Sequence, residues 1–313
     1  IYESLLANSS YIVVTNKALQ DQYWRDFKDR FPIQMLKGMQ NYDCVVNDNV
    51  KCDKGPCQGS DSTSIGIKRY CKINDMCPYY NTLKKAFDSK VFLANTSIMR
   101  SAVAPKGEQV KRDVMIIDEA HLLEDFLVDV GTISFSADKM IKAFEAEKRL
   151  RSEDLHYIKH CDFESSSKPT AKMEKYINIC QNLAQSIAKE LIEYEAEQQK
   201  RVVDSKVKKA MEDSSDSRKS KYKHKREILE TIAKIDAYKD SDETDSWVYN
   251  WDKKERRLDI VPVNVDWIFK KYFDGLADKI IFMSATILNL SNFANSLGIR
   301  PDKCCFVDVE STF

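Results

Sequence analysis

The chain has 313 residues, of which 31% are charged, and 49 basic residues balance 49 acidic residues to give a formal net charge of zero. This balance excludes a uniformly basic surface, so any affinity for nucleic acid must come from local patches. The length allows two or three domains, and the small number of glycines agrees with a helix-rich chain. No signal peptide, lipidation motif or long apolar stretch is visible. We therefore expect a soluble, intracellular protein with no membrane partner.

Four short apolar runs, each followed by polar residues, are typical of buried parallel strands. In chain order they are Tyr11–Val14 before Thr15 and Asn16, Val91–Ala94 before Asn95, Val114–Ile117 before Asp118, and Ile280–Met283 before Ser284. The runs predict an α/β fold with one parallel sheet, whose carboxyl edge binds ligands. For Thr15 and Asn16, a core strand leading into an ordinary helix cap is an equally good interpretation.

Cysteines are concentrated between the first two runs. Five of the nine lie within 34 residues, namely Cys44, Cys52, Cys57, Cys71 and Cys77. In an intracellular protein such a group favours metal binding over disulfides. Zinc sites usually have closely spaced cysteine pairs, and only Cys52 and Cys57 approach that spacing. A four-iron cluster tolerates irregular spacing, because separate loops can reach its corners. From the spacing, a cluster and zinc are equally good interpretations, with free thiols as a third.

Basic and aromatic residues alternate around the last two of these cysteines. They are Lys68, Arg69, Tyr70, Lys72, Tyr79, Tyr80, Lys84 and Lys85. The mixture suits single-stranded nucleic acid, since basic side chains neutralise phosphates and tyrosine rings stack on bases. An ordinary charged surface with half-buried tyrosines would give the same pattern.

The sequence Asp118-Glu119-Ala120-His121 directly follows the apolar run 114–117. Two carboxylates and a histidine are therefore expected where a buried strand meets its loop, which is the Walker B position of ATP-driven motors. There the aspartate holds Mg²⁺, directly or through water, and the next carboxylate orients or deprotonates the attacking water. We predict Asp118, Glu119 and His121 as catalytic residues, with Asp118 at Mg²⁺. The competing interpretation is an ordinary acidic first turn of a helix.

Residues 131–245 contain a long helical pattern and a basic segment. Apolar residues recur at steps of three and four at Tyr176, Cys180, Leu183, Ile187, Leu191 and Tyr194. This recurrence predicts one amphipathic helix. Residues 200–226 then carry eleven Lys or Arg against four Asp or Glu. We interpret them either as a contact to the DNA backbone or as a solvated loop between two antiparallel helices.

Strand patterns return after residue 246. Trp247–Tyr249 and Leu258–Val263 are predicted as short strands that lead back to the sheet, and a helix is expected over Asp266–Leu276. The tripeptide Ser284-Ala285-Thr286 then follows the last apolar run.

In their order along the chain, these segments resemble the motifs of superfamily 2 helicases. Thr15 and Asn16 resemble motif Ia, 118–121 resembles motif II, and 284–286 resembles motif III. Leu36–Cys44, Gly55–Cys57 and Cys77–Tyr80 resemble cysteine-bearing segments of the XPD/DinG family of iron–sulfur DNA helicases. In that family the cluster domain is inserted between motifs Ia and II, which is where these cysteines lie.

The resemblance implies a [4Fe-4S] cluster, and it implies ATP and Mg²⁺ as further cofactors of the complete protein. The implied cluster ligands are Cys44, Cys57, Cys71 and Cys77, with Cys52 as the alternative to Cys57. Ser284, Ala285 and Thr286 are the implied coupling residues. The DNA-binding candidates are Thr15, Asn16, Lys68, Arg69, Tyr70, Lys72 and Asn95.

The implied fold class is an incomplete RecA-like motor domain with two insertions. Its segments are motor domain 1 with motif Ia (1–35), the iron–sulfur domain (36–88), motor domain 1 with the acidic motif (89–130), a helical Arch domain (131–245), the return of motor domain 1 with motif III (246–298) and the start of motor domain 2 (299–313). The sequence has no G-x-x-x-x-G-K-[ST] and no motifs IV to VI. We therefore expect an internal part of a longer helicase that does not hydrolyse ATP by itself.

The function implied by the resemblance is part of an ATP-dependent DNA helicase. It would move 5′ to 3′ on single-stranded DNA and open forked or duplex DNA at the cluster domain, as a monomer. The expected location is the cytoplasm of a bacterium or a phage-infected host cell, with nucleoid association through DNA, in repair or phage replication. The alternative is a non-hydrolysing DNA-binding scaffold that keeps an iron–sulfur or zinc site. A phosphate-binding lysine encoded just before Ile1 would favour the helicase.

Overall fold

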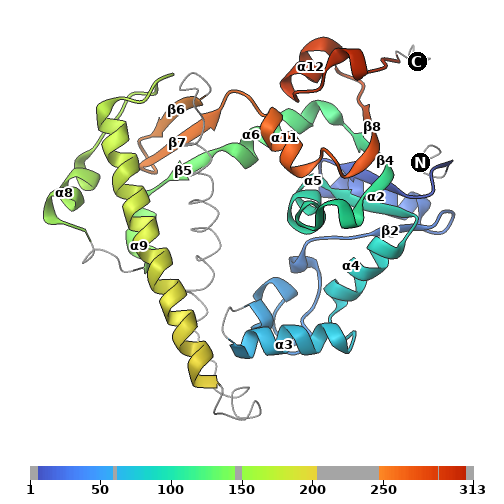
Figure 1. Cartoon of the computed structure of the whole chain (residues 1–313), viewed down its shortest axis with the longest axis horizontal. Coiled ribbons are helices and arrows are strands. Elements are labelled where there is room, and N and C mark those ends of the chain that lie inside the picture. Colours follow the sequence, from blue (N-terminus) through green and yellow to red (C-terminus); the bar gives the residue numbers. More distant parts are fainter. Residues whose placement is uncertain (1–5, 59–61, 145–149, 203–246, 288, 308–313) are drawn as a thin grey trace. The chain divides into compact units, whose positions relative to one another are not determined.

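A computed structural model of the chain is shown in Figure 1, and it describes residues 6–58, 62–144, 150–202, 247–287 and 289–307. The chain forms two compact units. Unit 1 comprises residues 1–55, 72–130 and 264–313, and unit 2 comprises residues 56–71 and 131–263. Each unit therefore joins segments that are far apart in the sequence. In the part of the chain that the structure describes, no helix is long and apolar enough to cross a membrane.

Unit 1 is built on a five-stranded parallel sheet in the order β2-β3-β1-β4-β8. The strands are β1 (Ser10–Val14), β2 (Ile33–Met35), β3 (Val91–Asn95), β4 (Arg112–Asp118) and β8 (Ala277–Met283). β1 and β3 are buried along their whole length, as apolar strands covered on both faces should be. The sheet confirms the predicted α/β class and the four predicted strands. β2 was not predicted, because three residues are too short for a periodic pattern.

The register of the sheet brings the polar strand ends together. Val14 pairs with Asn95, and Asp118 pairs with Met283. Parallel strands share the direction of their carboxyl ends. The residues that follow β1, β3, β4 and β8 therefore lie along one edge of unit 1.

The helices of unit 1 follow the strands of this sheet. They are α2 (Lys17–Phe27), α4 (Pro78–Asp88), α5 (Thr96–Ile98), α6 (Leu123–Gly131), α11 (Asp266–Tyr272) and α12 (Leu290–Ser296), while α3 (Ser62–Ile73) crosses the boundary between the units. Short 3₁₀ turns cover Met39–Asn41, Cys52–Lys54, Pro56–Gln58, Ala104–Val110, Ala120–Leu122 and Pro301–Lys303, and Met99–Val103 is a π-helical turn.

Helix α2 starts directly after β1 because Asn16 caps it. The Asn16 side chain accepts a hydrogen bond from the Leu19 N–H at 2.8 Å, which satisfies one of the unpaired donors of the first turn. Leu19, Tyr23 and Trp24 pack against buried residues of β1, β2 and β3. Leu19 and Tyr23 are four residues apart and so lie on one face of the helix. The burial of this face fixes α2 against the sheet.

A buried arginine at the start of β4 ties α4 to the sheet. The Arg112 guanidinium donates to the carbonyls of Ser10, Ser89 and Lys90 and also to those of Ala86 and Phe87 near the end of α4. Its side chain also lies over the Tyr11 ring, with 4.8 Å between Cζ and the ring centroid. A buried cation is tolerated when its donors are satisfied. The planar fork of arginine meets that condition here with carbonyl oxygens.

Unit 2 contains a three-stranded antiparallel sheet and a long helix. The sheet has the order β5-β7-β6, with β5 (Ile133–Phe135), β6 (Trp247–Asp252) and β7 (Arg257–Pro262), and the helices are α7 (Ala137–Phe144), α8 (Ser152–His160) and α9 (Ala171–Val202). The predicted helix stripe is confirmed at Tyr176, Cys180, Leu183 and Ile187, which are all buried. The side chains of Leu191 and Tyr194 lie outside the described residues, as does most of the basic segment 200–226.

The strands predicted to lead back to the parallel sheet form part of unit 2 instead. β6 pairs with β7, and β7 pairs with β5, so all three belong to the antiparallel sheet. The chain rejoins unit 1 at residue 264, before α11. The predicted strands therefore exist, and their pairing partners, which an apolar alternation does not specify, lie in unit 2.

Candidate nucleotide and metal sites

The acidic pair lies at the carboxyl end of β4, as predicted. Asp118 is the last residue of the strand. Its Oδ1 accepts a hydrogen bond from the Glu119 N–H at 2.9 Å. Glu119 has a φ of 51°, a left-handed conformation that is uncommon for residues other than glycine. This sharp turn ends the strand.

A tyrosine that the sequence did not single out also contacts Asp118. The Tyr23 hydroxyl on α2 donates to Asp118 Oδ2 at 2.8 Å. Burial raises the pKa of Tyr23, and the hydrogen bond to Asp118 and the charges of Asp118 and Glu119 raise it further. The hydroxyl therefore stays protonated and acts as the donor. Tyr23 lies on the apolar face of α2, so its position in the sequence resembles that of an ordinary core residue.

His121 joins the acidic motif to the segment after β8. Its Nδ1 lies 2.9 Å from Ser284 Oγ and 3.3 Å from Glu119 Oε2. Ser284 Oγ in turn accepts the Thr286 N–H at 3.2 Å. The neighbouring positions of β4 and β8 bring these residues together, although more than 160 positions separate them in sequence. Ala285, the second predicted coupling residue, is exposed and can form hydrogen bonds only through its backbone.

The DNA-binding candidates on the sheet edge occupy neighbouring positions after β1 and β3. Asn95 caps α5 by accepting the Ile98 N–H at 3.0 Å, and its Nδ2 donates to Gln20 Oε1 at 3.3 Å. Asn16 caps α2, as described above. The Thr15 hydroxyl oxygen is buried and has no hydrogen-bond partner in the described structure. Both asparagines are helix caps, which is the structural interpretation that the sequence also allowed.

Three of the five clustered cysteines belong to unit 1. Cys44 and Cys52 are held by a small antiparallel bridge between Asp43 and Lys51, and Cys77 precedes α4 as its N-cap residue. The sulfurs of Cys52 and Cys77 are 3.9 Å apart in a buried environment. Burial raises the pKa of the Cys52 thiol to about 12, and Cys77 and Cys44 add to that rise. The structure thus places Cys52, the alternative ligand, next to a predicted one.

The surroundings of Cys44 favour a glycine at position 55. A Cβ atom there would lie 3.0 Å from the Cys44 sulfur, which is closer than most Cβ contacts in proteins. The chain therefore passes Cys44 without a side chain between them.

Cys57 and Cys71 are buried within the segment of unit 2 that covers residues 56–71. Among the described residues, no three His, Cys, Asp or Glu side chains form a preformed metal-binding group. The assignment of Cys44, Cys57, Cys71 and Cys77 as cluster ligands stays a prediction.

The basic residues near the cysteines are displayed on α3 and α4. Arg69, Tyr70 and Lys72 are exposed on α3, and Lys68 is half-buried. The Lys72 ammonium lies 4.3 Å from the centroid of the Tyr80 ring, a cation–π contact that holds one charge beside an aromatic face. The exposed charges are available to phosphate groups.

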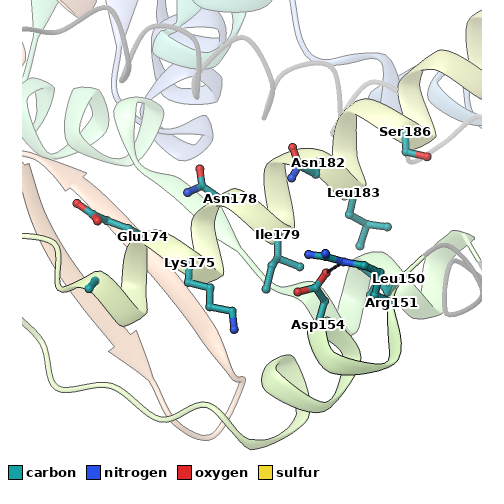
Figure 2. Close-up of a pocket in the computed structure, with 11 residues that line it drawn as sticks. Leu150, Arg151, Asp154, Glu174, Lys175, Asn178, Ile179, Asn182, Leu183 and Ser186 are labelled. Carbon is teal, nitrogen blue, oxygen red and sulfur yellow. Dashed lines mark hydrogen bonds and ion pairs between the residues drawn. The ribbon is translucent and has the colours of Figure 1, made fainter.

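Unit 2 carries a cavity of about 610 Å³ between α8 and α9 (Figure 2). Figure 2 shows Asn178 and Asn182 on α9, and Arg151 paired with Asp154 beside α8. None of the predicted site residues lines this cavity. The cavity therefore shares no lining residue with the acidic motif or the clustered cysteines.

The parallel sheet, with the acidic pair at the end of β4, resembles a RecA-like α/β core. Residues 12–140 match the model of the DEAD_2 family. This part of the chain is therefore a DEAD_2 domain of the XPD/DinG type, and the predicted resemblance is confirmed.

Solved structures show the same fold over almost the whole chain. An XPD helicase matches 95% of this chain with a TM-score of 0.54 and 14% identity, and a truncated XPD matches 94% with a TM-score of 0.51 and 13% identity. The chain spans 53% of the first protein and 86% of the second. At such identities the likeness establishes the fold alone. No curated protein matches the chain.

Proposed function

We propose that the chain is the central part of an ATP-dependent DNA helicase in which Asp118 and Glu119 serve the hydrolysis of ATP. One observation carries this proposal: the acidic pair ends β4, and His121 connects it to Ser284 after β8. In a motor, the residues around ATP must be connected to those that respond to DNA. The His121 Nδ1 atom, which lies 3.3 Å from Glu119 Oε2 and 2.9 Å from Ser284 Oγ, supplies such a connection.

The roles follow from the chemistry of these side chains. When ATP and Mg²⁺ are bound, Asp118 holds the metal ion, which stabilises the charge on the transferred phosphoryl group. Glu119 orients the attacking water and accepts its proton. The phosphate-binding lysine and an arginine partner belong to the rest of the full-length protein.

The proposed nucleic acid is single-stranded DNA. The protein would act as a monomer on forked or duplex DNA and move 5′ to 3′ along one strand. Support comes from the XPD-type fold and from Arg69, Tyr70 and Lys72, which are exposed together on α3. Exposed basic residues next to an aromatic ring fit the backbone and bases of a single strand.

The cysteines supply the chemistry that a [4Fe-4S] cluster requires. Cys44, Cys52 and Cys77 are buried thiols on two segments of unit 1, residues 1–55 and 72–130, and thiolates are the usual ligands of such clusters. We propose Cys44, Cys71 and Cys77 as ligands, with Cys52 preferred to Cys57 as the fourth because its sulfur lies 3.9 Å from that of Cys77. When bound, the cluster would join these segments covalently.

One distance supports zinc as the second candidate, as in the alternative DNA-binding scaffold. Cys52 and Cys77 have sulfurs 3.9 Å apart. Two thiolates on one tetrahedral zinc ion, with bonds of about 2.3 Å, have sulfurs about 3.8 Å apart. Metal analysis of the purified protein separates the two candidates.

The motor proposal is tested with Glu119→Gln in the full-length protein. The change removes the proton acceptor with little change in size, so DNA-stimulated ATP hydrolysis should fall by about 10²-fold or more while nucleotide binding is kept. Glu124→Gln is the matched control, because Glu124 is exposed on α6 and should leave the rate unchanged. Equal rates in wild type and Glu119→Gln would refute the motor role. A wild-type protein that binds DNA but hydrolyses no ATP would establish the scaffold.

A further inference from the structure

Both oxygens of the Asp118 carboxylate have a hydrogen-bond donor from the protein. The Glu119 N–H donates to Oδ1 at 2.9 Å, and the Tyr23 hydroxyl donates to Oδ2 at 2.8 Å. A carboxylate accepts about four hydrogen bonds or metal contacts in total. Two donors therefore fix the plane of the carboxylate and still leave lone pairs for Mg²⁺ or its water.

Tyr23 is held in place by the rest of α2. Gln20, three residues earlier and on the same face, is buried and donates to the Leu36 carbonyl at 2.8 Å. Its Oε1 accepts from Asn95 Nδ2 at 3.3 Å. The Tyr23 ring packs near Phe27, with centroids 5.8 Å apart. The hydroxyl is thus delivered to Asp118 by a helix whose orientation is set independently of Asp118.

The same helix carries residues of the sheet edge. Asn16 caps its first turn, and Gln20 contacts Asn95; both asparagines are DNA-binding candidates. α2 therefore connects two neighbouring strand ends to the Asp118 carboxylate through one hydroxyl group.

We propose that Tyr23 is a positioning residue of the Mg²⁺ site, which holds the Asp118 carboxylate in the orientation that binds the metal ion. This proposal rests on the proposed function, in which Asp118 holds Mg²⁺. Tyr23 itself does not contact the metal ion or ATP.

The test is Tyr23→Phe in the full-length protein, with Mg²⁺ titrations of two readouts: the binding of a fluorescent ATP analogue, and DNA-stimulated ATP hydrolysis. Partners that orient a metal ligand typically change metal affinity by about 10-fold or more when removed. We expect the Mg²⁺ concentration for half-maximal binding of the analogue and for half-maximal rate to rise about 10-fold. The rate at saturating Mg²⁺ should change by less than about threefold, because the carboxylate itself remains. A purely structural role would lower that saturating rate without moving the midpoint.

Tyr11→Phe is the matched control. Its hydroxyl donates to the Val110 carbonyl in the same unit, so the variant removes one tyrosine hydrogen bond away from Asp118. It should leave the Mg²⁺ midpoint unchanged. Asp118→Asn tests the Mg²⁺ role of Asp118 separately from the positioning role of Tyr23. An unchanged Mg²⁺ midpoint in Asp118→Asn would refute the Mg²⁺ role of Asp118 itself.

If Asp118→Asn shifts or abolishes the Mg²⁺ response but Tyr23→Phe matches wild type, the positioning role is wrong and the proposed function stands. A lower midpoint in Tyr23→Phe would also overturn it, since Tyr23 would then compete with Mg²⁺. Should Tyr23→Phe fail to fold, Tyr23→Leu is measured in its place. Failure of both variants to fold would make Tyr23 a structural residue and overturn the proposal.

Discussion

His121 Nδ1 lies 2.9 Å from Ser284 Oγ, and this contact joins the turn after β4 to the turn after β8. Because His121 also lies 3.3 Å from Glu119 Oε2, the histidine bridges the proposed catalytic carboxylate and the proposed coupling segment. The Ser284 hydroxyl is the side-chain group through which the segment after β8 contacts His121.

Removal of this hydroxyl should separate ATP hydrolysis from DNA unwinding. In the full-length protein, Ser284→Ala removes the hydrogen bond to His121, worth about 0.5–1.5 kcal/mol, together with the local bonds to Thr286. We expect unwinding per ATP hydrolysed to fall by about 3- to 10-fold, measured with a forked DNA substrate and a phosphate-release assay. Ser296→Ala is the control, because the Ser296 hydroxyl bonds to Glu124 and to its own helix, away from His121. Unwinding and hydrolysis that fall together would contradict a coupling role.

The metal prediction concerns the choice between Cys52 and Cys57. Because Cys52 lies next to Cys77, we expect Cys52→Ser and Cys77→Ser to reduce the metal content alike, and Cys57→Ser to reduce it less. Protein purified without oxygen should be brown with about four irons per chain if a [4Fe-4S] cluster is bound. About one zinc in a colourless sample would establish the second candidate. Full metal content in Cys52→Ser with a reduced content in Cys57→Ser would restore the ligand set inferred from the sequence.

The DNA prediction concerns the exposed charges of α3. Arg69 and Lys72 are both exposed, and each phosphate that is no longer neutralised should reduce the salt slope of single-strand binding by about 0.7. Reversal of both to Glu should therefore weaken binding and reduce the slope by about 1.4. Reversal of Lys270 and Lys271, which are also exposed but on α11, changes the net charge equally and should have a smaller effect. Equal effects of the two double reversals would show that total charge, and not α3, determines the affinity.

The stability prediction concerns Arg112. Arg112→Met removes a buried cation and its five hydrogen bonds to carbonyls of β1, α4 and the α4–β3 turn. Since a hydrogen bond to a charged group is worth about 1.5–3 kcal/mol, we expect the free energy of unfolding of unit 1 to fall by at least about 3 kcal/mol. Urea denaturation measures this change. Arg112→Lys should be intermediate because it keeps the charge and removes the fork. Arg25→Met, at an exposed position of α2, should change stability by less than about 0.5 kcal/mol.

The sheet and the acidic motif were predictable because their signals are local. An apolar run such as Val114–Ile117 encodes a buried strand within a few residues, and the position of Asp118 follows from where that strand ends. The contact between His121 and Ser284 then follows from the parallel order of the sheet. The predicted strand ends were therefore correct even without knowledge of the register.

The remaining features depend on partners that are distant in the sequence. Tyr23 occupies an apolar position of its helix, and only the packing of α2 shows that its hydroxyl reaches Asp118. Arginine is usually a surface residue, so the sequence does not reveal that Arg112 is only 6% exposed. The spacing of Cys52 and Cys57 did not show which of them is the metal ligand. In the structure, the antiparallel bridge between Asp43 and Lys51 precedes Cys52, whose sulfur lies beside that of Cys77.

The length of α4 is constrained more strictly than its composition. Cys77 caps the start of this 11-residue helix, and Arg112 holds carbonyls at its end. Each residue added to an α-helix rotates one end against the other by about 100° and shifts it by about 1.5 Å. An insertion or deletion of one residue would therefore turn the Cys77 thiol away from Cys52 if Arg112 kept its hydrogen bonds to the carbonyls at the other end. Natural variants of this protein should accept many side chains on the exposed face of α4 but very few changes in its residue count.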